Sequence, residues 1–269
     1  MQSILTSKRP LTPLARIGLG VIAWFLVLGL WYMAAELEWI NPIALPHPGD
    51  VVKSFLSLWS EYDLLGNVAM SWWRIAQAFF WSALIAIPLG ILMAGFEPVY
   101  HFVNPVAAPM RSMPVSAFLP ALMGLLGLDE GMKIGFLFLG MFFYLLAVVV
   151  EEAWRVRREL VETSLTLGAG KKQVLWLVFC ASAAPIYSSF RILYDIGWTY
   201  VILAEVVNSR KGVGYMIEAA RKFLDFDRVY AGIIAIGLAA FAFRWILRSS
   251  EKLLFPWLRV PKSARKGAA

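Results

Sequence analysis

Three ionisable side chains stand inside a largely apolar stretch of the second half of the chain. Arg191 and Asp195 are four residues apart, and Glu205 follows further along the same stretch. At about 100° per residue of a helix, these residues share one stripe with Ser188 and Trp198. Arg191 and Asp195 are then spaced to form an ion pair. Charges inside a membrane span are costly and usually face protein or water. We expect the stripe either to border a polar path or to be a neutralised structural pair against another helix.

A second polar segment, residues 151–173, separates two apolar runs of the chain. Because charged residues cannot lie in hydrocarbon without partners, we interpret it as an aqueous loop. Within it the sequence predicts a short amphipathic helix that ends at Gly168, since glycine adopts the left-handed conformation at little steric cost. The alternative is a solvated loop helix without a partner. The residues of this helix that we expect to contact a partner are Glu162, Thr163, Ser164, Leu165 and Gly168.

Several kinds of chemistry have no sequence signal. No glycine-rich loop with Lys-Ser/Thr is present, and the Gly-Val-Gly at residues 212–214 lacks the lysine of a phosphate loop. No Gly-x-Ser-x-Gly nucleophile motif occurs. The single Cys180 has no disulfide partner, and His47 and His101 are far apart in sequence, so we expect no metal site. We therefore expect no cofactor in this chain and nucleotide hydrolysis, if required, in another chain.

Composition indicates a polytopic membrane protein. Of 269 residues, 60% are hydrophobic and only 16% are charged, and the mean hydropathy is +0.67. A soluble fold cannot bury that much apolar surface. The 12 Trp and 9 Tyr are typical of the aromatic belts at membrane interfaces. The net charge of +7 favours contact with anionic lipid through basic loops, and we expect no nucleic acid partner.

The apolar runs predict an all-α protein with six transmembrane helices. The expected spans are Ile17–Ala35, Ile75–Gly95, Met113–Leu128, Ile134–Val150, Ile186–Val207 and Tyr230–Leu247. Residues 97–111 are then a cytoplasmic turn, and residues 171–179 a separate interfacial helix. We also place Arg74 at the outer end of the second span, where its guanidinium would reach the interface.

The third expected span is short and rich in proline and glycine. Broken helices of this kind are tolerated in membranes where they line a cavity or pack tightly against neighbours. We therefore add Met113, Pro114 and Pro120 to the candidates for a path through the membrane.

Charge asymmetry predicts the orientation of the chain. The first apolar run follows a basic segment with Lys8, Arg9 and Arg16 and precedes an acid-rich loop, and the C-terminal tail is strongly basic. The positive-inside rule then places both termini, and the loop at residues 151–173, in the cytoplasm. We interpret the first run as a retained span, because no convincing cleavage site follows it.

The spacing in the central loop resembles the cytoplasmic loop of ABC importer permeases. That loop has Glu-Ala-Ala, three residues, Gly, nine residues and then Ile-x-Leu-Pro. The resemblance is carried by Glu162, Thr163, Ser164, Gly168, Val178 and Pro185, whereas Cys180-Ala181 departs from Leu-Pro. Further matches to the nitrate, sulfonate, taurine and bicarbonate group are Leu45-Pro46-x-Pro48, Arg111-x-x-Pro114, Leu119-Pro120, Gly127, Lys133, Arg191, Ala204-Glu205, the glycine pair and Phe255-Pro256-Trp257.

The resemblance covers residues 45–257 and implies a type I importer-like fold. It implies one permease domain at 1–269, with a core at about 68–250, in a bacterial inner membrane. The expected partners are a second copy of the chain, two ATPase subunits that bind ATP and Mg, and a periplasmic or lipid-anchored binding protein. The helix at Glu162–Gly168 would contact the ATPase, and transport would occur by alternating access around a central site.

The substrate stays open at this point. A small anion or zwitterion such as nitrate, bicarbonate, a sulfonate or taurine fits the resemblance, and so does a small organic precursor such as a thiamine pyrimidine. A different class of protein, a proton-coupled secondary transporter, would use Arg191, Asp195 and Glu205 as a relay. A membrane-embedded enzyme would need a reactive cluster that the sequence does not contain.

Overall fold

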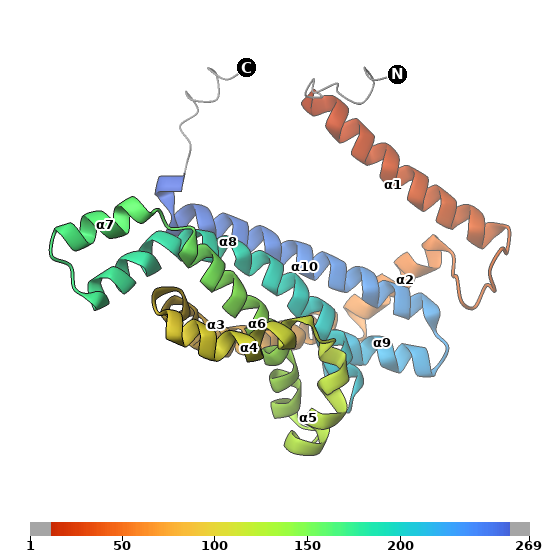
Figure 1. Cartoon of the computed structure of the whole chain (residues 1–269). Coiled ribbons are helices and arrows are strands. Elements are labelled where there is room, and N and C mark those ends of the chain that lie inside the picture. Colours follow the sequence, from red (N-terminus) through yellow and green to blue (C-terminus); the bar gives the residue numbers. More distant parts are fainter. Residues whose placement is uncertain (1–11, 259–269) are drawn as a thin grey trace, which may run out of the picture.

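The computed structural model describes residues 12–258, and all regular structure within them is helical. The elements in chain order are α1 Pro13–Glu36, α2 Pro48–Ser60, α3 Leu64–Gly95, α4 Glu97–Ser112, η1 Val115–Phe118, α5 Leu119–Leu126, α6 Glu130–Trp154, α7 Arg158–Thr166, α8 Lys171–Val206, α9 Val213–Lys222, α10 Phe226–Leu254 and η2 Pro256–Leu258. The all-α prediction is confirmed for these residues. Figure 1 shows α8 and α10 side by side along the length of the molecule.

Within the part of the chain that the structure describes, five helices are long and apolar enough to cross a membrane: α1, α3, α6, α8 and α10. Each contains one of the expected spans, except that the span Ile186–Val207 extends one residue beyond the end of α8. The helices extend beyond the apolar runs because polar residues cap them: the Asp63 side chain accepts a hydrogen bond from Gly66 N, and that of Asp225 accepts one from Arg228 N. Hydropathy thus located these spans correctly and underestimated their length.

The expected span at residues 113–128 is not one helix. Pro114 is extended, with ψ of 115°, and separates α4 from η1 and the short helix α5. Gly127, with φ of +75°, then follows the end of α5. The expected turn at residues 97–111 is instead helix α4, although it contains Pro105 and Pro109. Helix α5 alone is too short to cross a bilayer.

Close contacts fix the directions of the long helices. Helices α3 and α6 run the same way, because Arg74 near the start of α3 meets Glu130, and Gly90 near its end lies against Val149. Helix α8 runs the opposite way, since Glu205 near its end also meets Arg74. The bundle therefore has two ends, which we call the α7 end and the α9 end after the short helices found there (Figure 1).

Helix α8 is continuous from Lys171 to Val206, so the prediction of a separate interfacial helix at residues 171–179 is wrong. Pro185 lies inside α8 without ending it. A proline within a helix removes a backbone hydrogen bond, and packing against neighbouring helices compensates for the loss. Leu175 in the first part of α8 packs against the main core cluster of the bundle.

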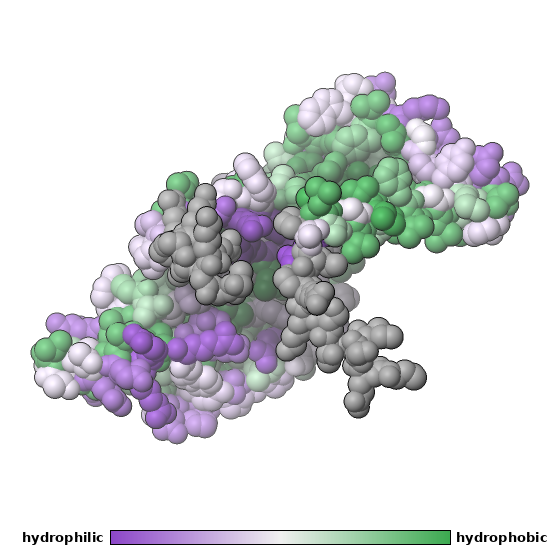
Figure 2. All heavy atoms as spheres, turned by 90° about the horizontal axis from the view of Figure 1, so that it is seen from above, coloured by the Kyte–Doolittle hydropathy of each residue, from purple (hydrophilic) through white to green (hydrophobic). Residues whose placement is uncertain are grey.

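The core lies where α3, α6 and α8 meet. A Cβ atom at Gly197 would come within 2.3 Å of Met141 Cε and 2.8 Å of Ile75 Cγ2, so the absence of a side chain allows this close approach. In contrast, none of the most apolar window of α1 is buried. In Figure 2, apolar residues cover the surface over α1, whereas hydrophilic residues gather toward the α7 end. This distribution suits a protein whose flanks contact lipid.

Candidate coupling and transport sites

Helix α7 projects at one end of the bundle, between α6 and α8 (Figure 1). It contains the Glu162, Thr163 and Ser164 of the predicted helix. Two apolar side chains at its C-terminal end are open: Leu165 is 55% and Leu167 is 84% exposed. The C-terminal end of α7 therefore presents two apolar side chains beside its polar and charged residues.

The end of α7 has the geometry that the sequence predicts. Gly168 has φ of +84°, and its N–H donates to Leu165 O, while Ala169 N donates to Ser164 O at 2.9 Å. These bonds satisfy carbonyls that a helix end otherwise leaves unpaired. A Cβ atom at Gly168 would meet nothing within 4 Å, so the glycine serves the backbone conformation and not a close contact. Gln173 Oε1 accepts from Gly170 N at 2.7 Å and caps the start of α8.

The predicted Arg191–Asp195 pair is wrong, because both side chains bind α10 instead. Arg191 Nη1 donates to Glu251 Oε2 at 2.8 Å. Ser188 Oγ donates to the same Glu251 carboxylate, and Asp195 pairs with Arg244. Glu251 and Arg244 on the facing helix α10 are thus the ion-pair partners of Arg191 and Asp195, which do not pair with each other. The two pairs join the central part of α8 to the second half of α10.

Glu205 belongs to a different cluster at the α9 end, where its carboxylate is fully enclosed. Its side chain is 0% exposed and accepts from Arg74 Nη1 at 2.7 Å and from Ser71 Oγ at 2.7 and 2.9 Å. Arg74 also binds Glu130 through Nε at 2.6 Å and Nη2 at 2.7 Å, and Lys133 Nζ lies 2.8 Å from Glu130 Oε1. The cluster therefore ties α3, α6 and α8 together.

Arg74 is 1% exposed, so its predicted place at the interface is wrong. A guanidinium with two carboxylate partners inside the bundle has no reason to extend to water, because the pairing offsets the cost of burial. Sequence reasoning missed Arg74 and Ser71 as partners of Glu205, and Glu130 as the second carboxylate partner of Arg74. The signal that could have found them is an arginine immediately before the expected span Ile75–Gly95, which itself contains no carboxylate.

The glycine pair at residues 212 and 214 wraps around Glu205. Gly214 N donates to Glu205 Oε2 at 2.8 Å, Val213 N to Ser71 Oγ at 2.9 Å, and Gly212 N to Asn67 Oδ1 at 2.7 Å. Gly212 has φ of +126°, and a Cβ there would lie 2.4 Å from the Glu205 carboxylate. Only glycine fits at this position, so the pair fastens the loop before α9 onto the buried carboxylate.

The remaining path candidates lie in different surroundings. Trp198 is 2% exposed, and its ring lies 6.1 Å from that of Phe243 on α10. Met113 is 47% exposed, and Pro114 and Pro120 are exposed at the break between α4 and α5. The structure therefore does not bring the expected stripe and the broken segment together within one subunit.

Outside the long helices, α9 carries a further ion pair. Arg221 donates to both Glu218 carboxylate oxygens at 2.7 Å. These hydrogen bonds lower the pKa of Glu218, so the carboxylate stays charged well below neutral pH. Over residues 12–258, no group of His, Cys, Asp and Glu has an arrangement that could hold a metal ion.

Long apolar helices around a tightly packed core, with a short polar helix projecting at one end, define a multi-pass membrane protein. Residues 86–260 match the family of binding-protein-dependent transport system inner membrane components, and the chain belongs to this family. It is therefore the permease subunit of an ABC importer and not the enzyme that hydrolyses ATP.

Named relatives place the chain within one part of this family. It is 31% identical over 254 residues to the taurine transport system permease protein TauC of Escherichia coli (strain K12), covering 92% of each chain. It is 28% identical to the putative aliphatic sulfonates transport permease protein SsuC of Bacillus subtilis (strain 168), covering 88% of this chain and 87% of that one. The nitrate import permease protein NrtB of Synechocystis sp. is 23% identical, covering 68% and 67%.

Proposed function

We propose that this chain forms the transport path of an ATP-driven importer for a small sulfonate or related anion or zwitterion. The likeness to the taurine, sulfonate and nitrate permeases supports the substrate class. The complex contains two copies of this chain, because one such bundle has too few helices to enclose a path and a two-fold copy supplies the other wall. Two ATPase subunits bind ATP and Mg, and a periplasmic or lipid-anchored protein delivers the substrate.

The observation that carries this proposal is helix α7. Its exposed Leu165 and Leu167, together with Glu162, Thr163 and Ser164, offer a mixed surface on which an ATPase subunit docks. Because α7 is joined directly to α6 and through Gly168 to α8, a push on α7 moves two long helices of the core. This coupling favours an ATP-driven importer over a proton-coupled secondary carrier, whose relay would need Arg191, Asp195 and Glu205 in one chain of contacts.

We expect uptake by the reconstituted complex to require the ATPase subunit, ATP and an intact Gly168. In Gly168→Val, a β-branched residue must adopt a positive φ, which distorts the end of α7. The variant should insert normally and then either lose the ATPase or hydrolyse ATP without transport. We expect coupled uptake to fall at least about tenfold, because a small misplacement of α7 removes its fit to the ATPase. Uptake and hydrolysis are measured together in proteoliposomes.

The matched control is Gly170→Val, the same change two residues later. Gly170 has φ of −76°, and a Cβ there would approach nothing closer than Gln173 Oε1 at 3.7 Å. This variant should retain coupled uptake. Wild-type coupling in Gly168→Val would remove α7 from the coupling role, and uptake without any ATPase subunit would establish the secondary transporter instead.

We also propose six membrane crossings, with both termini in the cytoplasm. Helices α3 and α6 are parallel neighbours, so the chain between them must return across the membrane. The segment α4–η1–α5 is the element available for that return, and Leu126 near its end packs 3.0 Å from the position of a Cβ at Gly135, near the start of α6. A broken crossing of this kind is tolerated where it lines a cavity.

Cysteine labelling in intact cells tests this topology, in a background where Cys180 is serine. We expect Asp129→Cys, after α5, to react with an impermeant maleimide from outside, and Glu97→Cys, before α4, only after the membrane is opened. Ser60→Cys and Arg158→Cys serve as outer and inner controls. Labelling of residues 97 and 129 from the same side would mean that α4–η1–α5 does not cross.

The path candidates stay predictions under this proposal. Arg191, Asp195 and Ser188 face α10 in the subunit, and Met113, Pro114 and Pro120 are open toward a second copy or the lipid. Trp198 and Glu205 are buried inside the subunit, and a path role for them requires a rearranged state of the importer.

A further inference from the structure

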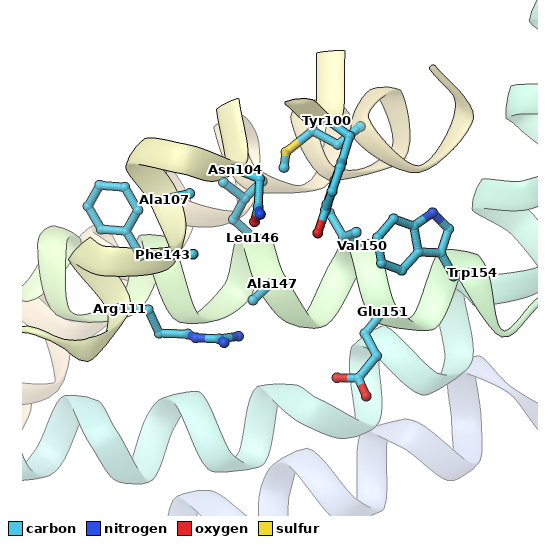
Figure 3. Close-up of a pocket in the computed structure, with 12 residues that line it drawn as sticks. Tyr100, Asn104, Ala107, Arg111, Phe143, Leu146, Ala147, Val150, Glu151 and Trp154 are labelled. Carbon is cyan, nitrogen blue, oxygen red and sulfur yellow. The ribbon is translucent and has the colours of Figure 1, made fainter. Parts of the chain in front are cut away.

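A cavity of about 370 Å³ lies between α4 and α6, apart from the ion pairs described above. Figure 3 shows side chains from both helices extending into it. Ala107, Leu146 and Val150 are nearly buried and form an apolar wall. The polar and aromatic lining comes from Tyr100, Asn104 and Arg111 on α4 and from Phe143, Glu151 and Trp154 on α6.

Opposite charges stand at the two ends of this cavity. Figure 3 shows the guanidinium of Arg111 and the carboxylate of Glu151 on the side of α6 that faces α8 in this view, with open space between their ends. Among residues 12–258 the side chain of Arg111 has no ion-pair or hydrogen-bond partner. Glu151 pairs with Arg155 at 2.9 Å, but both side chains are more than 60% exposed, so this contact is weak and easily exchanged.

Aromatic faces surround the carboxylate end. Tyr100 and Trp154 lie with ring centroids 4.9 Å apart, and both line the cavity. Aromatic rings and a carboxylate together attract an ammonium group. At the other end, the planar guanidinium of Arg111 presents donors that match a pair of oxyanion oxygens, and the Asn104 amide can donate a further hydrogen bond.

We propose that this cavity binds a small zwitterion, an aminosulfonate whose two charges are joined by a short methylene chain. The sulfonate binds Arg111 and Asn104, the ammonium binds Glu151 beside the Trp154 ring, and the methylene groups lie on the apolar wall. This inference rests on the proposed function and deepens it, because it selects a zwitterion over a simple anion. Glu151 and Trp154 lie near the end of α6 that leads into α7, so the orientation proposed above places the site in the cytoplasmic half of the membrane.

Equilibrium binding of radiolabelled taurine to the permease–ATPase complex in nanodiscs, without the binding protein, tests the proposal. Unlabelled ethanesulfonate lacks the ammonium, and ethylamine lacks the sulfonate. We expect taurine to compete at least about tenfold better than either analogue, since each loses one charged hydrogen-bond partner. Glu151→Gln should bring taurine down to the level of ethanesulfonate, and Arg111→Gln should weaken taurine and ethanesulfonate alike.

The control is Glu152→Gln, because Glu152 also pairs with Arg155, at 2.6 Å, but does not line the cavity. It should leave all three competition curves unchanged. The proposal is overturned if wild type does not bind taurine, if Glu151→Gln still separates taurine from ethanesulfonate, or if Glu152→Gln has the same effect. The proposed function fails separately, when the full system with the binding protein shows no ATP-driven uptake of any sulfonate or related anion.

Discussion

Glu205→Ala is expected to prevent the subunit from reaching its folded state. The change leaves Arg74 at the centre of the bundle without one of its two carboxylates, and it leaves Ser71 Oγ and Gly214 N without their acceptor. Removing one partner of a buried ion pair costs about 3–5 kcal/mol. That is a large part of the roughly 5–15 kcal/mol by which a typical domain is stable. The yield of monodisperse protein and its melting temperature measure the effect.

Glu218→Ala is the matched control, since Glu218 is also a carboxylate with an arginine partner near the same end. Its partner Arg221 is 61% exposed, so this pair contributes little. We expect a near-normal yield for Glu218→Ala and an intermediate yield for Glu205→Gln, which keeps the shape and one acceptor oxygen. A folded Glu205→Ala protein with an unchanged melting temperature would mean that the cluster does not hold the α9 end together.

The rigidity of this end has a consequence for transport. Three long helices and the loop before α9 are fastened by one network of charged hydrogen bonds, whereas α7 at the other end touches the core mainly through its chain connections. Motion that begins at α7 therefore meets a fixed point at the α9 end. This arrangement suits rocking of whole helices more than local unwinding.

Hydropathy was sufficient to predict five of the spans, because an apolar run long enough to cross a bilayer rarely forms any structure other than a transmembrane helix. It failed at residues 97–128, where prolines and polar residues interrupt a segment that is helical in pieces. Hydropathy averages over the proline breaks in this segment. It therefore did not reveal helix α4, and residues 97–111 were assigned to a turn. The separate helix expected at residues 171–179 failed for a related reason, since Pro185 does not end α8.

Among the candidate sites, those formed by residues close in sequence were predictable, and those formed between helices were not. The end of α7 was predictable because Gly168 acts on its own backbone, within a few residues of sequence. The Glu205 cluster was not, because Arg74 and Glu130 come from other helices and only the fold brings them together. The Arg191–Asp195 pair was inferred from spacing within one helix, but each residue pairs with a residue of α10 instead. The sequence alone does not show whether a charged side chain pairs with a residue one turn away or with a residue on a neighbouring helix.

Arg191→Leu is expected to abolish transport, and a second substitution tells why. Arg191 is 31% and Glu251 is 17% exposed in their side chains. Removing the arginine therefore leaves a largely enclosed carboxylate that keeps, among the interactions within residues 12–258 named above, the hydrogen bond from Ser188. An unpaired charge there costs up to several kcal/mol, which should lower the folded yield. The double variant Arg191→Leu with Glu251→Leu removes both charges and should restore the yield. Adding Asp195→Leu to Arg191→Leu in place of Glu251→Leu should not, because Asp195 pairs with Arg244.

Uptake by the restored double variant then decides the role of the pair. Replacing an ion pair by apolar groups of similar size is often neutral for folding, so a structural pair predicts near-normal uptake and ATPase activity. A pair that borders the path predicts a folded complex that binds its ATPase and transports nothing, because the polar wall that the substrate passes has become apolar. Rescue of the folded yield by Asp195→Leu instead of Glu251→Leu would contradict the pairing between α8 and α10 itself.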